Sequence, residues 1–228
     1  NTFSLGEMTG EKGWKPEVKR INNETIEIKA EGTNYSIVRT IKLVDNNKIN
    51  IKDKIINKKD EPIGLIIKNN VNLEELPKAR TYRLAGVEDK DSFSTGIGAN
   101  PTLFVTQKES SVGIVAEDNI FRLQMELLKQ RNQFQFFIKH FGLREGTSYT
   151  LEWTIYPSNE KEYFSFINKV RNDWNVNFTI LGPFVFSDSY IPERKAKIYL
   201  VGPWLEYGTI NPQTDRPYTR EEYKQIVK

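Results

Sequence analysis

The residues that most often carry nucleophilic and acid–base chemistry are scarce in this chain. It contains one histidine, His140, and no cysteine. The missing cysteine excludes disulfides, thiolate catalysis and Cys-ligated zinc or iron–sulfur sites. A Ser-His-Asp triad would depend on His140, and the sequence has no Gly-x-Ser-x-Gly elbow to support one. We expect His140 to be an edge or surface residue at the end of a strand, beside Phe141.

Carboxylates are the remaining residues with catalytic potential. Glycoside hydrolysis requires two of them, about 5 to 10 Å apart. The sequence does not show which carboxylates form a pair, so it assigns no catalytic residue. The candidates are Glu117, Asp118, Asp188, Glu206 and Asp215.

The segment around Glu206 has the composition of a sugar-binding surface. Glu206 lies between Trp204 and Tyr207, after a predicted strand. Sugar C–H faces pack on aromatic rings, and sugar hydroxyls hydrogen-bond to carboxylate oxygens. The residues predicted to bind carbohydrate are therefore Asp188, Trp204, Glu206 and Tyr207. In the alternative interpretation, the two rings are buried and Glu206 is solvated.

Neither a metal nor another cofactor is expected. One histidine leaves only carboxylate oxygens as ligands, and the acidic segments 45–47 and 88–91 lack the spacing of a calcium-binding loop. We expect both to shape turns through side-chain bonds to the local backbone. The glycines of segment 96–100 precede a predicted strand rather than the helix that a phosphate-binding loop requires.

Charge and hydropathy exclude two classes of partner. The 33 basic and 30 acidic residues give a net charge of +3, and no Lys/Arg block marks a nucleic-acid or membrane surface. No apolar run approaches the roughly 18 residues of a membrane span.

The chain begins at Asn1 without a leader, so we expect a segment of a longer protein. An extracellular or cell-envelope location is favoured.

Period-two alternation predicts the elements that must position these residues. One long strand places Tyr35, Ile37, Arg39, Ile41 and Leu43 on one face, and the next places Ile49, Ile51, Asp53 and Ile55 on one face. A three-residue loop, 45–47, joins them. Directly opposed residues share a face, so this register sets Arg39 against Asp53. We expect a structural ion pair; the alternative is a polar pair on a ligand-binding face.

Further strands follow at regular spacing, without helical patterns between them. The predicted strands cover 102–106, 112–116, 121–127, 134–138 and 149–155. Such spacing favours an antiparallel sandwich over βαβ units.

The apolar period then becomes helical between Asn159 and Asn175. Tyr163, Phe164, Phe166, Ile167, Val170 and Trp174 form a stripe that is expected to pack on the sandwich. Asn159 and Glu162 have capping-box spacing, and Pro157 is expected to end the preceding strand. Further on, segment 196–201 reads as a strand and Thr219 as the cap of a last helix.

These segments together resemble a known family. The meander ends in 146–153, Gly-Thr-Ser-Tyr-Thr-Leu-Glu-Trp, which is similar to the closing strand of galactose-mutarotase-like "supersandwich" domains. Segment 166–179, followed by Gly182-Pro183-Phe184, resembles the helical linker of bacterial glycoside-hydrolase-like proteins in which a sandwich precedes a (β/α)8 barrel. The resemblance implies an accessory sandwich, with catalysis at the barrel. It does not imply mutarotase activity, because that chemistry uses more than one histidine.

The sequence thus predicts a mainly β, antiparallel supersandwich with a C-terminal linker helix and a partial βα unit. The expected domains are a sandwich at 1–157, a helical linker packed on it at 158–195, and the first βα unit of a barrel at 196–228. The expected function is a non-catalytic accessory domain of a carbohydrate-active protein, with the rest of the same polypeptide and a carbohydrate as partners.

The alternatives are a free-standing carbohydrate-binding module, with exposed Trp14, Tyr35, Tyr82 and Trp204, and a glycosidase or polysaccharide lyase using Glu206 or Asp188.

Overall fold

A computed structural model gives the architecture, and its chain divides into two units, 1–174 and 175–228. The structure describes residues 2–5, 8–9, 11, 13–72, 81–88, 94–96, 100–106, 110–130, 133–176, 184–187, 198–201, 210–211 and 213–226.

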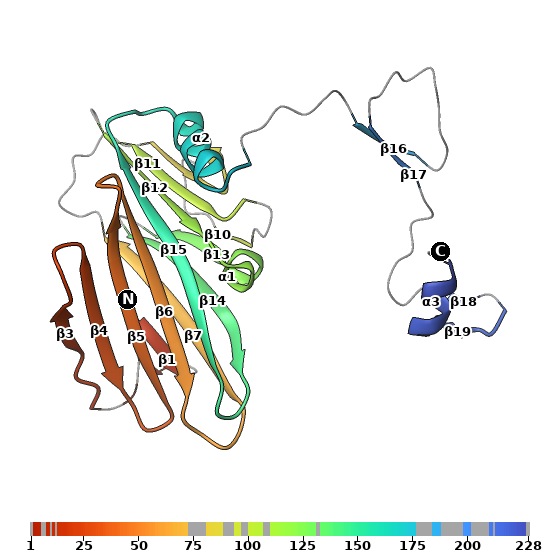
Figure 1. Ribbon diagram of the computed structural model, residues 1–228, viewed down its shortest axis with the longest axis horizontal. Helices are drawn as coiled ribbons and strands as arrows, with labels where there is room; N and C mark the ends of the chain where they lie inside the picture. Colours follow the sequence, from red (N-terminus) through yellow and green to blue (C-terminus); the bar gives the residue numbers. More distant parts are fainter. Residues whose placement is uncertain are drawn as a thin grey trace. The chain divides into compact units, whose positions relative to one another are not determined.

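The first unit contains a nine-stranded antiparallel sheet, seen from its outer side in Figure 1. Its order along the sheet is β3-β4-β5-β6-β15-β12-β11-β8-β9. The strands are β3 (Glu17–Arg20), β4 (Thr25–Glu31), β5 (Tyr35–Val44), β6 (Lys48–Asn57), β8 (Tyr82–Leu84), β9 (Val87–Glu88), β11 (Thr102–Thr106), β12 (Ser111–Ala116) and β15 (Ser148–Ser158).

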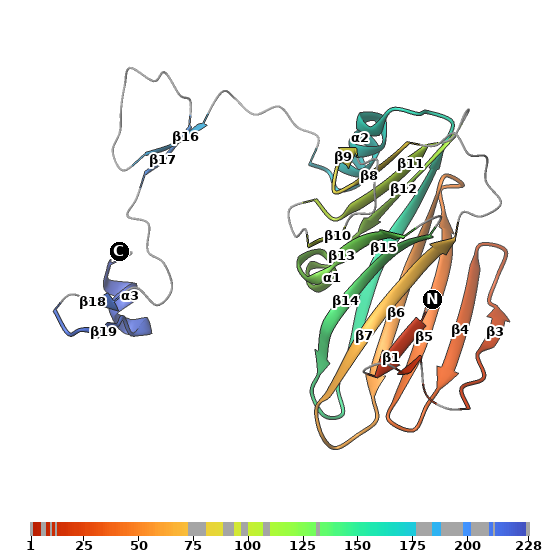
Figure 2. The ribbon, with the colours of Figure 1, turned by 180° about the vertical axis from the view of Figure 1, so that it is seen from behind.

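A six-stranded antiparallel sheet packs against it and is nearer the viewer in Figure 2. Its order is β10-β13-β14-β7-β1-β2. The strands are β1 (Thr2–Leu5), β2 (Met8–Thr9), β7 (Ile63–Asn72), β10 (Ser94–Gly96), β13 (Glu126–Gln130) and β14 (Gln133–Leu143). The predicted mainly β, antiparallel sandwich is therefore confirmed.

The core lies between the two sheets and follows the alternation of the strands. Ile37, Ile51 and Ile55 contribute from the nine-stranded sheet, and Leu65 and Ile67 from the six-stranded one. All are 4% exposed or less, which places their side chains in the interior where apolar burial stabilises the fold.

The β5–β6 hairpin has the register that the sequence predicts. Leu43 pairs with Ile49, and Arg39 pairs with Asp53. Asp45 and Asn46 in the loop have φ values of 50° and 54°. Aspartate and asparagine tolerate this left-handed region better than most residues, which explains their place in the turn.

Arg39 and Asp53 form an ion pair inside the sandwich. Arg39 Nε donates to Asp53 Oδ1 at 2.5 Å, and Nη2 donates to Oδ2 at 2.7 Å. The same Nη2 donates to Asn69 Oδ1 at 2.9 Å, on β7 of the opposite sheet. Trp153 Nε1 donates to Asp53 Oδ2 at 3.2 Å. The predicted contact is confirmed, and it connects the two sheets. That its role is structural remains our proposal, supported by exposed fractions of 6% for Arg39 and 0% for Asp53.

Replacing Asp53 by asparagine should destabilise the sandwich strongly. The Asp53→Asn variant keeps the side-chain shape but leaves the buried guanidinium without its carboxylate, a loss of about 3–5 kcal/mol. Urea unfolding measures this difference. Lys52→Ala is the matched control: it removes an exposed ion pair with Glu152, N to O 3.3 Å, and should cost less than about 1 kcal/mol. Equal losses in the two variants would contradict the structural role.

Glu11 holds the backbone where β4 turns into β5. Its carboxylate accepts hydrogen bonds from the amides of Thr33, Asn34 and Tyr35, at 2.5, 2.8 and 3.0 Å. The Tyr35 ring is fully buried and meets Trp14 edge-on, with centroids 4.9 Å apart. Burial and then the Glu11 charge raise the pKa of Tyr35 from 10.0 to about 12.

Tyr35 should therefore make the fold sensitive to alkali. Below pH 10 the phenol is protonated in both states; between about pH 10 and 12 only the unfolded chain loses the proton, so the free energy of unfolding falls. Tyr35→Phe should flatten that fall when urea unfolding is repeated across this range. At neutral pH it should cost little, because the Tyr35 hydroxyl has no hydrogen-bond partner among the described residues. An unchanged pH dependence would refute this assignment.

One predicted strand is partly wrong. Segment 121–127 was expected to alternate as a strand, but α1 (Asn119–Gln124) occupies its first half and β13 begins only at Glu126. Asp118 caps the helix, since its Oδ1 accepts from the amide of Phe121 at 3.0 Å. Phe121 is buried and Leu123 is 71% exposed, whereas alternation on a strand would place both on one face.

The linker helix is shorter than predicted. α2 (Tyr163–Asp173) begins four residues after Asn159, and Glu162, its N-cap, makes no side-chain capping bond. The predicted capping box is therefore wrong. The reason lies in β15, which continues through Pro157 to Ser158 by pairing with β12, so that residues 159–162 are needed to cross to the helix.

The second unit contains a parallel strand pair, a short hairpin and a helix. These elements are β16 (Phe184–Ser187), β17 (Ile198–Val201), β18 (Ile210–Asn211), β19 (Arg216–Pro217) and α3 (Arg220–Ile226). The parallel pairing of β16 with β17 was not predicted. The predicted cap of α3 is confirmed: Thr219 Oγ1 accepts from the amide of Glu222, whose carboxylate accepts from the amide of Thr219. Arg216 and then Thr219 lower the pKa of Glu222 to about 2.

Candidate binding site

Helix α2 lies on the outer face of the nine-stranded sheet, opposite the core (Figure 1). Phe166 is the centre of this contact, stacked on Phe104 with centroids 5.6 Å apart. Gly113 of β12 makes the close approach possible, because a Cβ built on it would lie 2.3 Å from the Phe166 ring. A buried apolar cluster results, formed by Phe104, Val115, Tyr156, Tyr163, Phe166 and Val170.

Tyr163 fixes the first turn of α2 to the sheet. Its ring is 8% exposed, and its hydroxyl lies 3.1 Å from both Asn100 Nδ2 and Thr102 Oγ1. The Arg83 guanidinium lies over the same ring, 5.5 Å from its centroid. These contacts hold the helix start rigidly against β8 and β11.

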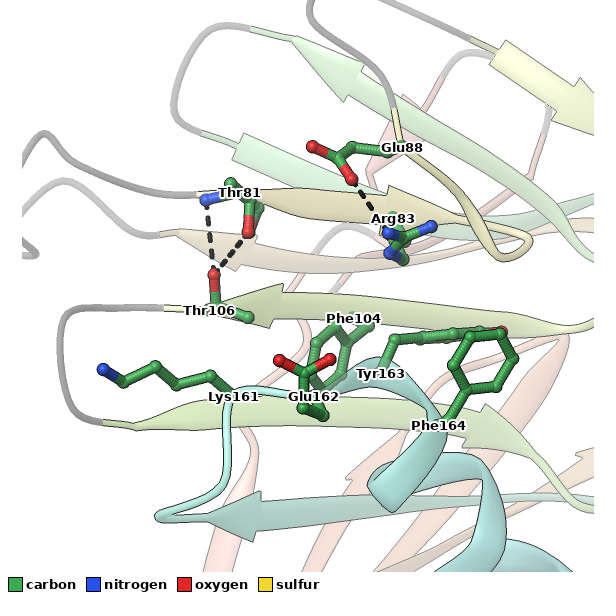
Figure 3. A pocket seen from close by; sticks show the side chains of 9 residues that line it. All are labelled: Thr81, Arg83, Glu88, Phe104, Thr106, Lys161, Glu162, Tyr163 and Phe164. Carbon is green, nitrogen blue, oxygen red and sulfur yellow. Dashed lines mark hydrogen bonds and ion pairs between the residues drawn. The ribbon is translucent and has the colours of Figure 1, made fainter.

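A cavity of about 310 Å³ opens beside this anchor. That volume is at the lower end of the range for small-ligand sites. Figure 3 shows Thr81, Arg83 and Glu88 on one side of it and Lys161, Glu162 and Phe164 on the other. The lining residues are Thr81, Arg83, Glu88, Phe104, Thr106, Lys161, Glu162, Tyr163 and Phe164.

The strand side of the cavity is a tight hairpin with satisfied polar groups. Arg83 Nη2 donates to Glu88 Oε2 at 2.8 Å, and Nη1 donates to the carbonyl of Gly86 at 3.1 Å. Ala85 and Gly86, between β8 and β9, have φ values of 54° and 78°, as a two-residue hairpin turn of this hand requires. This side therefore presents a fixed, hydrogen-bonded surface to the cavity.

Hydroxyls and one exposed ring complete the lining. The Oγ1 atoms of Thr81 and Thr106 lie 2.5 Å apart. Phe164 is 71% exposed, which corrects its predicted place in the buried stripe of the helix. Tyr163, Phe166 and Val170 bury one side of α2, and Phe164 lies about 100° away from Tyr163 on a helix with 3.6 residues per turn. The site can thus offer an aromatic surface next to hydroxyl and charged groups.

The other end of α2 is held by a second cluster. Trp174 Nε1 donates to Glu117 Oε2 at 2.5 Å, and the Arg122 guanidinium lies 4.4 Å from the Trp174 centroid. Tyr156 donates to Asp173 at 2.8 Å. Burial, and then this hydrogen bond to Asp173, raise the pKa of Tyr156. These contacts join α2 to α1 and to the sheet.

The candidate carboxylates of the sandwich have structural partners. Glu117 accepts from Trp174, and Asp118 accepts from Tyr149 at 3.1 Å and from the amide of Glu152 at 2.8 Å, besides capping α1. Asp215 lies in the turn between β18 and β19, with a φ of 50°. The remaining predicted site residues, Asp188, Trp204, Glu206 and Tyr207, lie outside the described residues.

His140 is exposed, as expected for a surface residue, and lies within β14 rather than at its end. The pairing of β14 with β7 shifts register between Ile138 and Phe141, so His140 belongs to a β-bulge. Among the residues that the structure describes, no cluster of three His, Asp or Glu side chains could hold a metal ion. None of the described helices has the length and apolarity needed to cross a membrane.

Three of the four aromatic residues proposed for a binding module are not exposed as expected, and the fourth, Trp204, lies outside the described residues. Tyr35 and Tyr82 are 0% and 8% exposed, and Trp14 is partly buried against Tyr35. Among the described residues, Phe164 is instead an exposed aromatic ring, and it was not predicted as a binding residue. A signal existed, because the helical period places Phe164 off the face that Tyr163, Phe166 and Val170 share.

Comparisons with known proteins find similar solved structures. No family model and no curated protein matches the sequence. Solved structures similar to the chain include the GalM/aldose epimerase homologue of C. elegans, at TM-score 0.48 and 12% identity over 64% of this chain and 69% of that one. A putative aldose 1-epimerase from Escherichia coli K12 has TM-score 0.44 and 11% identity, over 67% and 70%. The heparan sulfate lyase HepC from Pedobacter heparinus has TM-score 0.44 and 10% identity, over 71% and 24%.

These similarities, at TM-scores of 0.44 to 0.48, include aldose-epimerase-like structures of the galactose-mutarotase-like kind that the sequence resembles. This chain spans about two thirds of the epimerase-like proteins and about a quarter of the lyase. At such low identity the similarity concerns the architecture alone.

Replacing Gly113 by alanine should loosen α2 and with it one wall of the cavity. The new methyl group would lie 2.3 Å from the Phe166 ring, which is only 3% exposed. Overpacking of this kind costs about 1–3 kcal/mol, to be measured by urea unfolding. Gly64→Ala is the control, because a Cβ at this other strand glycine has no atom within 4 Å. Equal stability of the two variants would contradict the close packing of α2.

Proposed function

We propose that this chain is a non-catalytic accessory β-sandwich domain of a carbohydrate-active, glycoside-hydrolase-like protein. Its role is to support a catalytic barrel in the same polypeptide and to contact the polysaccharide. The observation that carries the supporting role is the parallel pairing of β16 with β17, over Phe184–Ser187 and Ile198–Val201.

A parallel pair of this size needs further structure around it. Parallel strands occur almost only in sheets whose two faces are covered, and two strands alone are marginal in water. Within the described residues, this sheet has no third strand. A neighbouring α/β domain that adds strands and helices would complete it, and the first strands of a barrel meet that requirement.

The non-catalytic part of the proposal is supported by the carboxylates of the sandwich. Glu117 and Asp118 accept hydrogen bonds that hold α2 and α1 in place. Carboxylate oxygens engaged in such bonds are occupied by groups of the domain itself. Both are therefore better explained as framework residues than as a catalytic pair.

The carbohydrate part is supported by the lining of the cavity beside α2. An exposed Phe164 ring, two threonine hydroxyls and charged groups at the rim combine the apolar and hydrogen-bonding contacts that a sugar ring offers. The same lining favours a free-standing carbohydrate-binding module as the second candidate function. That alternative requires the second unit, residues 175–228, to be stable without a neighbouring domain.

Amide hydrogen exchange on the whole chain distinguishes these two candidates. If the β16–β17 pair is completed only by a neighbouring domain, its amides should exchange far faster than those of β5 and β6 in the same molecule. The reason is that local unfolding of an incomplete sheet requires little free energy. Mass spectrometry of the exchanged chain provides the comparison.

Helix α3 serves as the internal control within the second unit, because the hydrogen bonds of its cap join Thr219 and Glu222 and need no further domain. Protection of β16 and β17 equal to that of β5 and β6 would mean that the sheet is complete, and the supporting role would be lost.

A further inference from the structure

We infer that the cavity between the β8–β9 hairpin, β11 and the start of α2 binds an uncharged saccharide, with Phe164 as its stacking surface. This inference rests on the proposed function and goes further, because it assigns the site and the class of sugar. The residues that carry it are Phe164, Thr81, Thr106, Arg83 and Glu88.

The Phe164 ring is exposed and lies beside an anchored neighbour. It is 71% exposed, while the adjacent Tyr163 is held by Asn100 and Thr102 inside the first turn of the helix. Its ring centroid lies 5.6 Å from that of Tyr163, in an edge-on arrangement. A ring on a rigid support loses little conformational freedom when a ligand packs on it, so more of the stacking energy contributes to affinity.

The hydroxyl groups of a sugar find both donors and acceptors in the lining. The Thr81 and Thr106 hydroxyls bond to each other at 2.5 Å, so the pair offers acceptor lone pairs and at most one O–H donor to a ligand. Glu162, at the N-cap of α2, makes no capping bond through its side chain and lies on the cavity wall. Figure 3 shows these groups on opposite sides of the cavity, where a ligand between them can bond to both.

The charge of the lining selects against acidic sugars. Arg83 and Lys161 are balanced by Glu88 and Glu162, so the formal charge of the lining is zero. Arg83 is already bound to Glu88 and to the carbonyl of Gly86. Sulfate and carboxylate groups are recognised by arginine forks that can pair with them, and a second anion beside Glu88 would be repelled. Neutral hydroxyls avoid this penalty.

Isothermal titration with two groups of oligosaccharides tests the inference. The neutral group contains gluco-, xylo- and manno-hexasaccharides, and the acidic group contains heparan sulfate fragments and oligogalacturonates. We expect heat with at least one neutral sugar and none with the acidic ones. Phe164→Ala should weaken that binding about tenfold, the change that corresponds to ~1.4 kcal/mol.

Leu123→Ala is the matched control, because Leu123 is a large apolar side chain with the same 71% exposure on α1, and its removal should leave affinity unchanged. Thr106→Val removes one hydroxyl at nearly constant volume and should also weaken binding. Binding of acidic sugars only, no binding at all, or full affinity in Phe164→Ala would each overturn the inference. Cleavage of any sugar would contradict the proposed non-catalytic function, whereas the titration itself tests only the binding inference.

Discussion

We propose that the buried ion pair between Arg39 and Asp53 is the interaction on which the sandwich depends. Two charges removed from water are tolerated only when their geometry is good and their remaining hydrogen-bonding groups are satisfied. Asn69 from the opposite sheet and the Trp153 indole supply the additional bonds. Because the pair has partners in both sheets, its proposed role is to align the two sheets as well as to hold the register of β5 against β6. A slip of one residue would turn Asp53 to the outer face.

The two faces of the nine-stranded sheet serve different purposes. Its inner face, with residues such as Ile37 and Leu151, forms the core. Its outer face carries α2, whose position is set by Gly113 beneath Phe166 and by the bonds of Tyr163. The cavity follows from this arrangement, since it is the space left where the helix begins beside the β8–β9 hairpin. Local packing of one helix therefore connects the fold to the proposed binding role.

Sequence patterns were most reliable where neighbouring residues decide the outcome. The β5–β6 register followed from matching apolar faces, and the Thr219 cap followed from a threonine placed directly before the last helix. They failed where two local signals compete. The alternation from Phe121 onward looked like a strand, but the Asp118 cap stabilises a helical turn. Phe164 was placed in the buried stripe because apolar character alone does not show which side of a helix faces the sheet.

What the sequence determined by itself is a layered antiparallel β structure, its long central hairpin, and the meeting of Arg39 with Asp53. These depend on side-chain alternation and on a three-residue loop, both of which act over a few residues. Only the tertiary structure decided that Asn69 joins the ion pair, that Gly113 admits Phe166, and that β16 lies parallel to β17. Each of these joins residues separated by a dozen or more positions, and no local period encodes which distant partner a side chain will meet.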